Sequence, residues 1–371
     1  MNELISTLTP VLGRTLLHFV WQGAVIGVVA AAALHALRGA RPQLRYLVAC
    51  CALLACLLAP ALTLAWLLNA STGGLMGSAI IGPEATVEID PARPFAALGG
   101  FAIERWLPAV VAMWAAGALV FAARIVLGLV AIQRLSRGAD HALQHQWQAR
   151  LDVLAQRLGL QRPVVLQVSE GLDSPATVGW LRPVVLLPAS LMTRLPADLL
   201  EALIAHELAH IRRHDYAVNL LQGLIEAVLF YHPVVWWLSR QVRVERELVA
   251  DRLAAEALGE PRRLACALAE LSDLRAHPHA PLRLVQAAHG GELMSRIQQL
   301  LRPGSSQARS RYALPLLGLA AGCIAVFAHA QVSPERPKTT PTRVPTVRVA
   351  APPAGPAQPR AVARANGVLN V

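Results

Sequence analysis

Two histidines and a glutamate within five consecutive residues carry the clearest chemistry in this sequence. His206-Glu207-Leu208-Ala209-His210 lies within Ala197–Arg213, whose apolar residues recur with helical spacing. Because about four residues make one helical turn, both imidazoles leave the same face of the helix. Imidazoles at that spacing can bind one zinc ion, and the carboxylate between them can take a proton from an attacking water. The motif predicts metal-assisted peptide hydrolysis with Glu207 as the base.

The helix that carries this motif is expected to be buried. Pro196 followed by Asp198 fits a helix start, with the acidic side chain near the positive end of the helix dipole. Five apolar residues would cover the helix: Leu199, Leu200, Leu203, Ile204 and Leu208. An unligated His-Glu-His group would be costly in such surroundings, which favours a bound metal.

A third ligand is predicted downstream, in the helical stretch Arg243–Leu258. Glu247 and Asp251 lie one turn apart on one face of it. Catalytic zinc takes three protein ligands, so Glu247 can complete the set and Asp251 can fix an imidazole tautomer. The alternative is a solvated helix face whose acids pair with neighbouring arginines: Arg243, Arg246 and Arg252. Beside the motif at 206–210, the ligand interpretation is the stronger one.

Two short β-branched runs upstream predict a small sheet. Val164–Val168 and Val184–Leu187 flank the segment Ser174–Trp180, and prolines bound the second run. An edge strand at this point could pair with an extended substrate backbone beside the metal. The alternative is a hairpin that merely packs on the motif helix.

The composition indicates a membrane protein with a water-exposed part. The chain has 371 residues, of which 55% are hydrophobic and only 15% charged, and its mean hydropathy is +0.44. The net charge of +11 raises the possibility of nucleic-acid binding. No basic helix, stacking motif or Cys/His finger supports that, and basic loops beside membrane spans explain the charge better.

Four apolar runs are long enough to cross a bilayer or nearly so. Three lie in a membrane region, 1–133, and a fourth follows a soluble domain at 134–310: about 16–37, 46–68, 106–133 and 311–330. The Pro-rich tail at 331–371 is expected to be disordered.

The distribution of charge predicts how these spans are oriented. The loop between the first two holds Arg38, Arg41 and Arg45 and no acid, so it should be cytoplasmic. The segment 69–105 carries four acids against two arginines, which fits the outside. The N-terminus is then outside and 134–310 cytoplasmic. Arginines flank the fourth run on both sides, so only the parity of crossings places the tail outside.

A fifth apolar run, 216–238, is not expected to be a span. It contains Gln222, Glu226 and His232, and a crossing there would separate Glu247 from the histidine motif. We therefore interpret it as a buried helix, or as a re-entrant or interfacial element broken near Pro233.

Residues 14–315 resemble the membrane metallopeptidases of family M56, which includes the BlaR/MecR-type antibiotic-sensor transducers. Five separated blocks carry the resemblance: Leu17–Gly23, Arg45–Cys50, Ser174–Pro188, His206–Asp215 and Arg246–Asp251. The resemblance implies a multi-pass protein of the bacterial inner membrane, with four spans and a cytoplasmic α+β zinc peptidase domain of the gluzincin type. It also implies roles for five residues: His206, His210 and Glu247 as zinc ligands, Glu207 as catalytic carboxylate and Asp251 as partner of a ligand.

The sensors carry a large penicillin-binding domain after the fourth span, whereas about forty Pro-rich residues follow here. β-Lactam sensing is therefore not expected. The preferred hypothesis is a signalling protease that cuts a cytoplasmic protein, such as a repressor, or itself. The alternatives are an HtpX-like quality-control protease and a catalytically idle scaffold whose tail binds an envelope partner. Complete ligands together with Glu207 argue against the idle scaffold, and the sequence does not indicate an oligomeric state.

Hydrolysis also needs a donor that stabilises the oxyanion of the transition state. Four residues are candidates, and the sequence does not choose between them: His214, Tyr231, His232 and Arg246. For the two histidines, an ordinary surface or capping role is the stronger interpretation.

Overall fold

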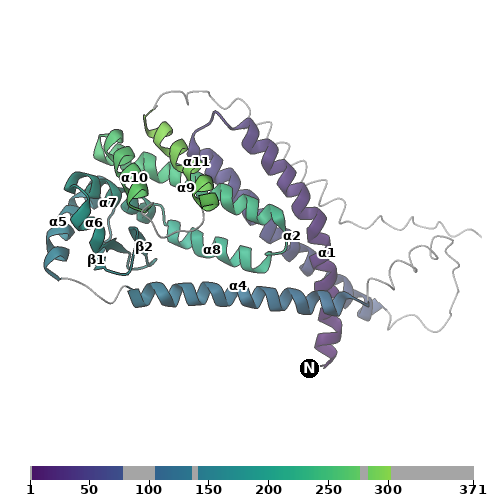
Figure 1. Cartoon of the computed structure of the whole chain (residues 1–371). Helices are drawn as coiled ribbons and strands as arrows, with labels where there is room; N and C mark the ends of the chain where they lie inside the picture. The colour runs from purple at the N-terminus through teal and green to yellow at the C-terminus, as the bar shows by residue number, and fades with distance from the viewer. Residues whose placement is uncertain (1, 78–104, 136–140, 276–282, 302–371) are drawn as a thin grey trace, which may run out of the picture. The chain divides into compact units, whose positions relative to one another are not determined.

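The computed structural model describes residues 2–77, 105–135, 141–275 and 283–301 (Figure 1). All of these fall in one unit, Met1–Ala320, while the second unit, Ala321–Val371, lies outside the described residues. The predicted fourth span, the Pro-rich tail and residues 78–104 of the predicted outside loop also lie outside them. The predicted domain boundaries stay predictions.

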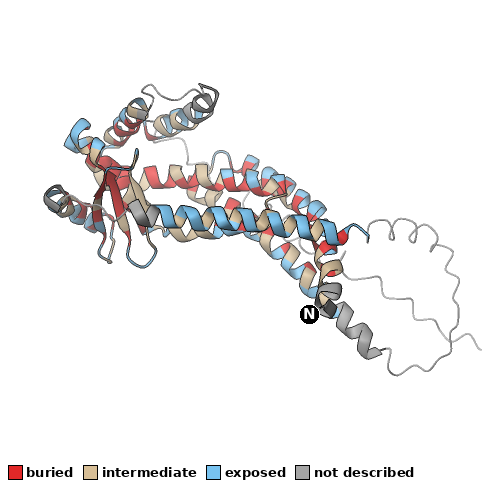
Figure 2. Cartoon of the chain, turned by 60° about the horizontal axis from the view of Figure 1, so that its bottom comes forward, coloured by how far each residue is buried: buried red, intermediate tan, exposed pale blue. Residues whose placement is uncertain are grey.

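Three long apolar helices confirm three of the predicted spans. They are α1 (Asn2–Ala36), α2 (Pro42–Gly77) and α4 (Leu107–Leu135). Their apolar stretches, long enough to cross a bilayer, are Leu8–Ala36, Pro42–Asn69 and Leu107–Ala131. α1 packs against both α2 and α4. Figure 2 shows large parts of α4 exposed although its residues are apolar, as expected of a helix surrounded by lipid.

The remaining part is mainly helical and contains one small sheet. Its helices are α5 (His141–Arg157), α6 (Ala189–Arg194), α7 (Ala197–Arg212), α10 (Pro261–Arg275) and α11 (Arg283–Leu301). α7 lies among them, in contact with α5 and α10 and also with the long helix α9 (Pro233–Leu258). The helix predicted at Ala197–Arg213 is thereby confirmed.

The sheet contains both predicted strands, here β1 (Val165–Ser169) and β3 (Val184–Pro188), and a third between them in sequence, β2 (Ala176–Val178). The strand order is β1-β3-β2, with β1 parallel and β2 antiparallel to β3. Gly179 allows the tight turn after β2, because its φ is +90° and a Cβ atom would lie 2.5 Å from the Arg182 carbonyl oxygen. Because of the strand order, β2 forms one edge of the sheet, and it contacts α7.

The apolar run 216–238 is divided between two helices, α8 (Asp215–Val228) and α9 (Pro233–Leu258). Proline fits the first turn of α9, where no backbone donor is lost, and His232 Nδ1 accepts a hydrogen bond from the Val234 amide at 3.2 Å. Gly259, with a positive φ, ends the helix. The predicted break near Pro233 is confirmed, and this run is not among the candidate spans of the described residues.

Candidate metal centre

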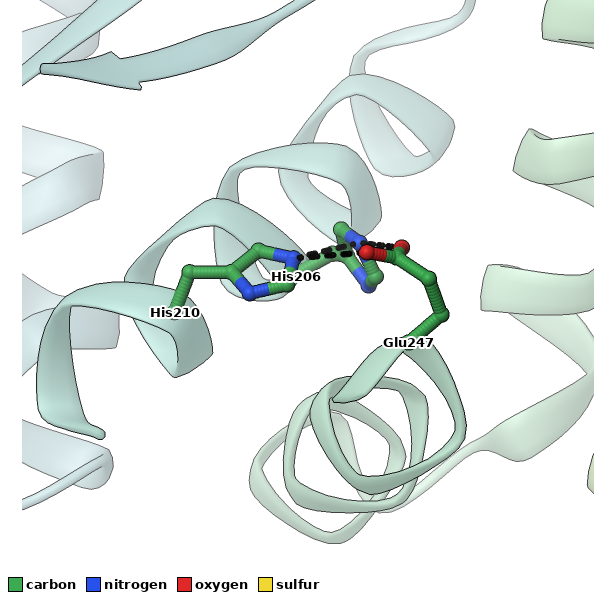
Figure 3. A group of neighbouring side chains, drawn as sticks. All are labelled: His206, His210 and Glu247. Carbon is green, nitrogen blue, oxygen red and sulfur yellow. Dashed lines mark hydrogen bonds and ion pairs between the residues drawn. The ribbon is translucent and has the colours of Figure 1, made fainter. Parts of the chain in front are cut away.

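The three predicted metal ligands meet where α7 crosses α9. His206 and His210 of α7 and Glu247 of α9 each offer one ligand atom, and these atoms lie within 4.8 Å of one another (Figure 3). The two Nε2 atoms are 3.1 Å apart. The Glu247 carboxylate lies 3.4 Å from His206 Nε2 and 3.8 Å from His210 Nε2. Both imidazoles thus present the same ring nitrogen to one carboxylate.

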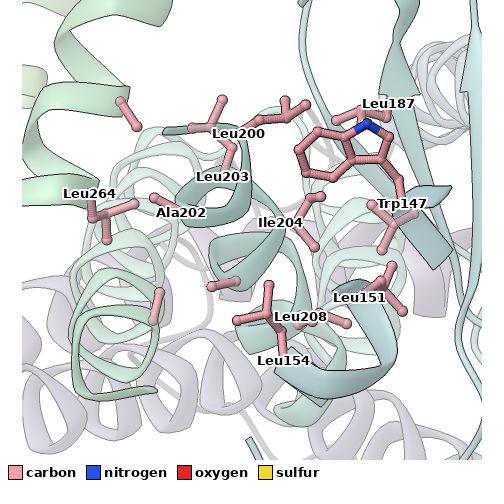
Figure 4. Packing of buried hydrophobic residues seen from close by; sticks show 14 of the residues in the cluster. Trp147, Leu151, Leu154, Leu187, Leu200, Ala202, Leu203, Ile204, Leu208 and Leu264 are labelled. Atoms are coloured by element: carbon pink, nitrogen blue, oxygen red, sulfur yellow. The ribbon is translucent and has the colours of Figure 1, made fainter. Parts of the chain in front are cut away.

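Apolar packing holds α7 in the position that this geometry needs. Leu200, Ile204 and Leu208 are fully buried on α7, as the sequence predicts (Figure 4). They pack against residues of neighbouring elements, among them Trp147, Leu151 and Leu154 of α5, Leu187 of β3 and Leu264 of α10. His206 and His210 lie one turn apart on another face of the same helix. The helical periodicity thus places apolar residues in the core and both imidazoles in the site.

The donor set fits zinc. Two imidazole nitrogens and one carboxylate oxygen are a common set of protein ligands for catalytic zinc, which leaves a fourth position for water or substrate. Both histidine side chains are largely buried, and that of Glu247 is 32% exposed. A cation shared by these two buried imidazoles, whose Nε2 atoms are 3.1 Å apart, would satisfy both ring nitrogens.

Each of the two imidazoles has its own aspartate on the far ring nitrogen. His206 Nδ1 lies 3.0 Å from Asp251 Oδ1, and His210 Nδ1 lies 2.8 Å from Asp215 Oδ2. Such contacts leave Nε2 free to bind metal and increase its basicity. Asp251 was predicted for this position, whereas Asp215 was not, although an acid directly after the motif helix was a usable signal. The turn between α7 and α8, with His214 at φ 59°, brings Asp215 back towards His210.

Arg296 of α11 is a further component that the sequence did not indicate. Its Nε and Nη2 atoms both donate to the Asp251 carboxylate at 2.7 Å, and its Nη1 lies 3.5 Å from Glu247 Oε2. The arginines considered from the sequence have other partners: Arg243 pairs with Glu226 and Arg252 with Glu256. Glu247 and Asp251 are thus paired from another helix, by an arginine 45 residues after Asp251.

The surroundings hold the acids of the centre in the ionised form. Burial by itself would lower the pKa of His206, but its contacts with Asp251 and Glu247 raise that pKa to about 10. Burial would likewise raise the pKa of Glu247, but His206, His210 and Arg296 lower it well below its usual range. The pKa of Asp251 is lowered in the same way, against its burial, by Arg296 and His206. Both carboxylates are therefore charged at neutral pH, as metal binding requires, while the proton that they favour on His206 must leave when a metal binds.

Glu207 is half-buried and points towards the sheet. The Thr177 hydroxyl of β2 donates a hydrogen bond to Glu207 Oε2 at 2.8 Å. Thr177 lies within the segment whose strand character the sequence did not reveal, so its role was not predicted. The bond fixes one carboxylate oxygen and leaves the other for proton transfer.

A pocket borders His210 on the side of β2. Its lining comes from the sheet, from the end of α7 and from the start of α8: Arg162, Thr177, Gly179, Trp180, Pro183, His210, Ile211, His214 and Tyr216. Arg162 donates to the Trp180 carbonyl at 2.9 Å and contacts His214 Nε2. The pocket therefore offers aromatic and apolar surface next to the metal ligands.

The four oxyanion candidates are placed differently. His214 is the one that lines this pocket among the described residues. Tyr231 and His232 point to α1, where they donate to the backbone oxygens of Leu16 and Val20 at 3.3 and 3.0 Å. Arg246 is buried and lies 3.4 Å from Asn219 Oδ1. The partners of these three side chains are thus not among the three ligand residues.

Comparison with known proteins places this geometry in a family context. The family model described as BlaR1 peptidase M56 matches residues 89–300. Regulatory protein BlaR1 of Bacillus licheniformis is 25% identical over 140 residues, which cover 38% of this chain and 23% of that protein. The methicillin resistance mecR1 protein of Staphylococcus aureus is 23% identical over 92 residues, or 25% of this chain and 16% of that protein.

A second group of similar proteins carries the name of a protease. Protease HtpX homolog 1 of Streptomyces coelicolor is 30% identical over 175 residues, which cover 37% of this chain and 57% of that protein. The chain thus spans about a quarter or less of the length of the BlaR1 and mecR1 proteins, and somewhat over half of the HtpX homolog.

Proposed function

Because the chain belongs to the M56 family of BlaR1-type peptidases, whose model matches more than half of its residues, we propose that it is a membrane-bound zinc endopeptidase. The observation that carries the proposal is the convergence of His206, His210 and Glu247 beside Glu207. Three helices that can cross a bilayer make it a multi-pass membrane protein, so its substrate is a protein at or near the membrane.

The residues divide the work of hydrolysis between them. When bound, zinc supplies a Lewis acid that polarises the scissile carbonyl and acidifies the attacking water. Glu207 takes the proton of that water and delivers it to the leaving amine. Thr177 holds Glu207 in the orientation for both transfers. Asp215 and Asp251 keep the two imidazoles in the tautomer that binds metal.

The edge of the sheet offers a place for the substrate backbone. β2 pairs with β3 through Ala176–Val178, and within the described ranges the sheet ends there. An extended peptide added alongside β2 would form backbone hydrogen bonds next to Thr177 and Glu207. The small pocket lined by Trp180 and Tyr216 would then border the substrate. His214, on the same pocket, is the best placed of the four candidate oxyanion donors.

We propose that the protease serves in signal transduction or regulated proteolysis and cuts a cytoplasmic or membrane-proximal protein, a repressor or itself. The similarity to a protein named as regulatory supports this. The second candidate is quality control of membrane proteins, supported by the 30% identity to an HtpX homolog. Comparing which cellular proteins are stabilised in cells that carry Glu207→Gln separates the two. Loss of a signalling protease should stabilise one or a few proteins, whereas loss of a quality-control protease should stabilise many.

The orientation proposed for the membrane rests on charge. Arg38, Arg41 and Arg45 at the junction of α1 and α2 favour the cytoplasm for that end, which puts the N-terminus outside and the zinc site inside. The apolar run at 311–330 would form a fourth span, and parity of crossings would then put the tail outside. Reporter fusions in the loop 69–105 and after residue 331 test this: both should report the outside, and a cytoplasmic signal from either contradicts the topology.

The enzyme proposal is tested by comparing the wild-type chain with Glu207→Gln in lipid nanodiscs. Hydrolysis of a peptide library and cleavage of the chain itself are both measured, and the zinc content of the same samples is determined. We expect the variant to retain zinc and to lose at least about 100-fold in hydrolysis, because its base is gone. Equal hydrolysis by both proteins would contradict the assignment of Glu207.

A further inference from the structure

Two consecutive residues near the start of the second membrane helix contact residues that lie close in sequence to the metal ligands. Arg45 of α2 forms an ion pair with Glu245 of α9, whose side chain is fully buried. Tyr46 lies against Arg213, whose guanidinium carbon is 4.5 Å from the centre of the phenol ring. α2 also packs along α9, the helix that carries Glu247. One end of a membrane helix thus contacts segments on both sides of the ligand cluster.

Arg213 connects Tyr46 to a metal ligand. Its Nη2 lies 3.5 Å from Asp215 Oδ1, and its Nη1 donates to the Arg246 carbonyl at 2.9 Å. The other oxygen of Asp215 contacts His210 Nδ1 at 2.8 Å. Tyr46, Arg213, Asp215 and His210 therefore form a continuous series of contacts from α2 to the metal site.

The burial of this series makes its geometry restrictive. The Asp215 side chain is 5% exposed and that of Arg213 is 13% exposed, so water cannot easily replace either contact. A carboxylate that binds an imidazole through one oxygen still turns about its own axis unless the second oxygen is also held. Arg213 restrains it electrostatically, as an ion-pair partner at 3.5 Å, and the flat face of Tyr46 limits where the guanidinium can lie.

We propose that Tyr46 is a positioning residue for the metal centre, acting through Arg213 and Asp215 on the imidazole of His210. The inference rests on the proposed function only in that His210 is a zinc ligand. It follows that the placement of α2 against the catalytic part affects how well the ligand set binds metal. The ring face of Tyr46 carries this role, because the recorded contact with Arg213 is made by the ring.

The test measures zinc affinity of the full chain in nanodiscs, by competition with a chromophoric chelator. Tyr46→Leu removes the ring, and we expect about fivefold weaker zinc binding, the size expected for loss of a partly buried cation–π contact. Tyr46→Phe keeps the ring and should bind zinc as the wild type does. Trp66→Leu, a substitution of an exposed aromatic residue on the same helix, is the matched control and should also leave affinity unchanged.

A second readout uses cobalt chloride in place of zinc. The visible absorption of bound cobalt reports ligand geometry, so Tyr46→Leu should shift the band while Tyr46→Phe and Trp66→Leu should not. If Tyr46→Leu does not fold, Arg213→Gln tests the same series of contacts at a residue outside the membrane helix. That variant should weaken zinc binding by about tenfold.

A double-mutant cycle separates a shared path from a general loss of stability. Asp215→Asn alone should weaken zinc binding by roughly 10- to 100-fold. Because Tyr46 acts through Asp215, adding Tyr46→Leu should change the affinity of that variant by less than about twofold. A further fivefold loss would show that the two residues act independently and would overturn the proposal.

Three other results would also overturn it. They are wild-type affinity in Tyr46→Leu, equal defects in Tyr46→Leu and Tyr46→Phe, and unchanged affinity in Arg213→Gln. If the wild-type chain binds zinc and Tyr46→Leu binds it equally well, the positioning role alone fails. If the wild-type chain binds no zinc, the proposed function fails with it.

Discussion

At the scale of single residues, the centre is built from paired roles. Each predicted ligand histidine has an aspartate behind it, Asp251 for His206 and Asp215 for His210. Glu207, the proposed base, has Thr177 as its partner. In all three pairs one residue provides the atom that binds metal or takes the proton, and the other orients that side chain. The orienting residues can therefore be substituted while the ligands and the base are retained.

Substitution of Thr177 should slow catalysis without loss of metal. In Thr177→Val the hydrogen bond to Glu207 is lost while the side chain keeps its size, and kcat should fall by about tenfold, the effect of losing one hydrogen bond to a charged group. Thr177→Ser retains the hydroxyl and should remain close to wild type. Steady-state kinetics and zinc analysis of the three proteins check this; wild-type kcat in Thr177→Val would remove Thr177 from the mechanism.

How far the sequence predicted the site depends on how local each contact is. The spacing of His206 and His210 is a property of one helix, and Glu247 with Asp251 is a second local pattern on another. Asp215 directly follows the motif helix and gave a local signal, whereas Arg296 required the packing of α11, which no local pattern encodes. Long-range partners of this kind follow from tertiary structure only.

At the scale of elements, α9 connects the site to the neighbouring helices, including one that can cross the membrane. It carries Glu247 and Asp251, contacts α7, α10 and α11, and packs along α2. The sequence predicted its second half at Arg243–Leu258, whereas the helix begins at Pro233. The apolar first half concealed the helix start, because the proline was interpreted only as a break. Short strands were equally difficult: β2 has three residues, too few for a visible alternation.

Two ion pairs between α9 and α11 should differ strongly in their effect on stability. Arg296 pairs with the nearly fully buried Asp251, while Arg240 pairs with Glu292 at the surface. Arg296→Gln leaves a buried carboxylate without its cation and should lower the free energy of unfolding by about 3 kcal/mol. Arg240→Gln should cost less than about 1 kcal/mol. Chemical denaturation of the metal-free proteins measures both, and equal losses would contradict the burial argument.

The contact between α1 and the tip of the α8–α9 hairpin depends on a glycine. A Cβ atom at Gly23 would lie 2.6 Å from His232 Nε2, the atom that donates to the Val20 carbonyl. Gly23→Ala should therefore destabilise the protein by about 1–3 kcal/mol through overpacking. Gly128→Ala, in α4 with nothing within 4 Å of the new atom, should be neutral or slightly stabilising. Thermal unfolding in detergent distinguishes the two, and similar midpoints for both variants would show that this contact does not restrict α1.

At the scale of the whole molecule, the membrane helices and the metal-binding part form one continuous packing system. α1, α2 and α4 all contact α8 or α9, so the site is supported from the bilayer side as well as from its own core. Composition and hydropathy predicted three of these spans directly. The proposed orientation depends on the distribution of charge alone, and the fourth span lies outside the described ranges, so both stay predictions.

Removal of metal should affect the stability of the whole chain. Zinc that binds only the folded state stabilises it by mass action, so a chelator should lower the unfolding midpoint and added zinc should restore it. In His210→Ala the ligand set is incomplete, and the chelator should have little further effect. Differential scanning fluorimetry of the two proteins with and without chelator tests this; an equal response to the chelator in both would contradict a zinc site at His210.

The central claim is that one zinc ion is bound by His206, His210 and Glu247, and X-ray absorption at the zinc edge tests it most directly. For the purified wild-type chain we predict about one zinc per chain, with imidazole nitrogens and carboxylate or water oxygens at about 2.0–2.2 Å. Glu247→Ala should lose the metal or one of its oxygen neighbours. Absence of zinc, sulfur scatterers at about 2.3 Å, or a spectrum unchanged in Glu247→Ala would contradict the claim.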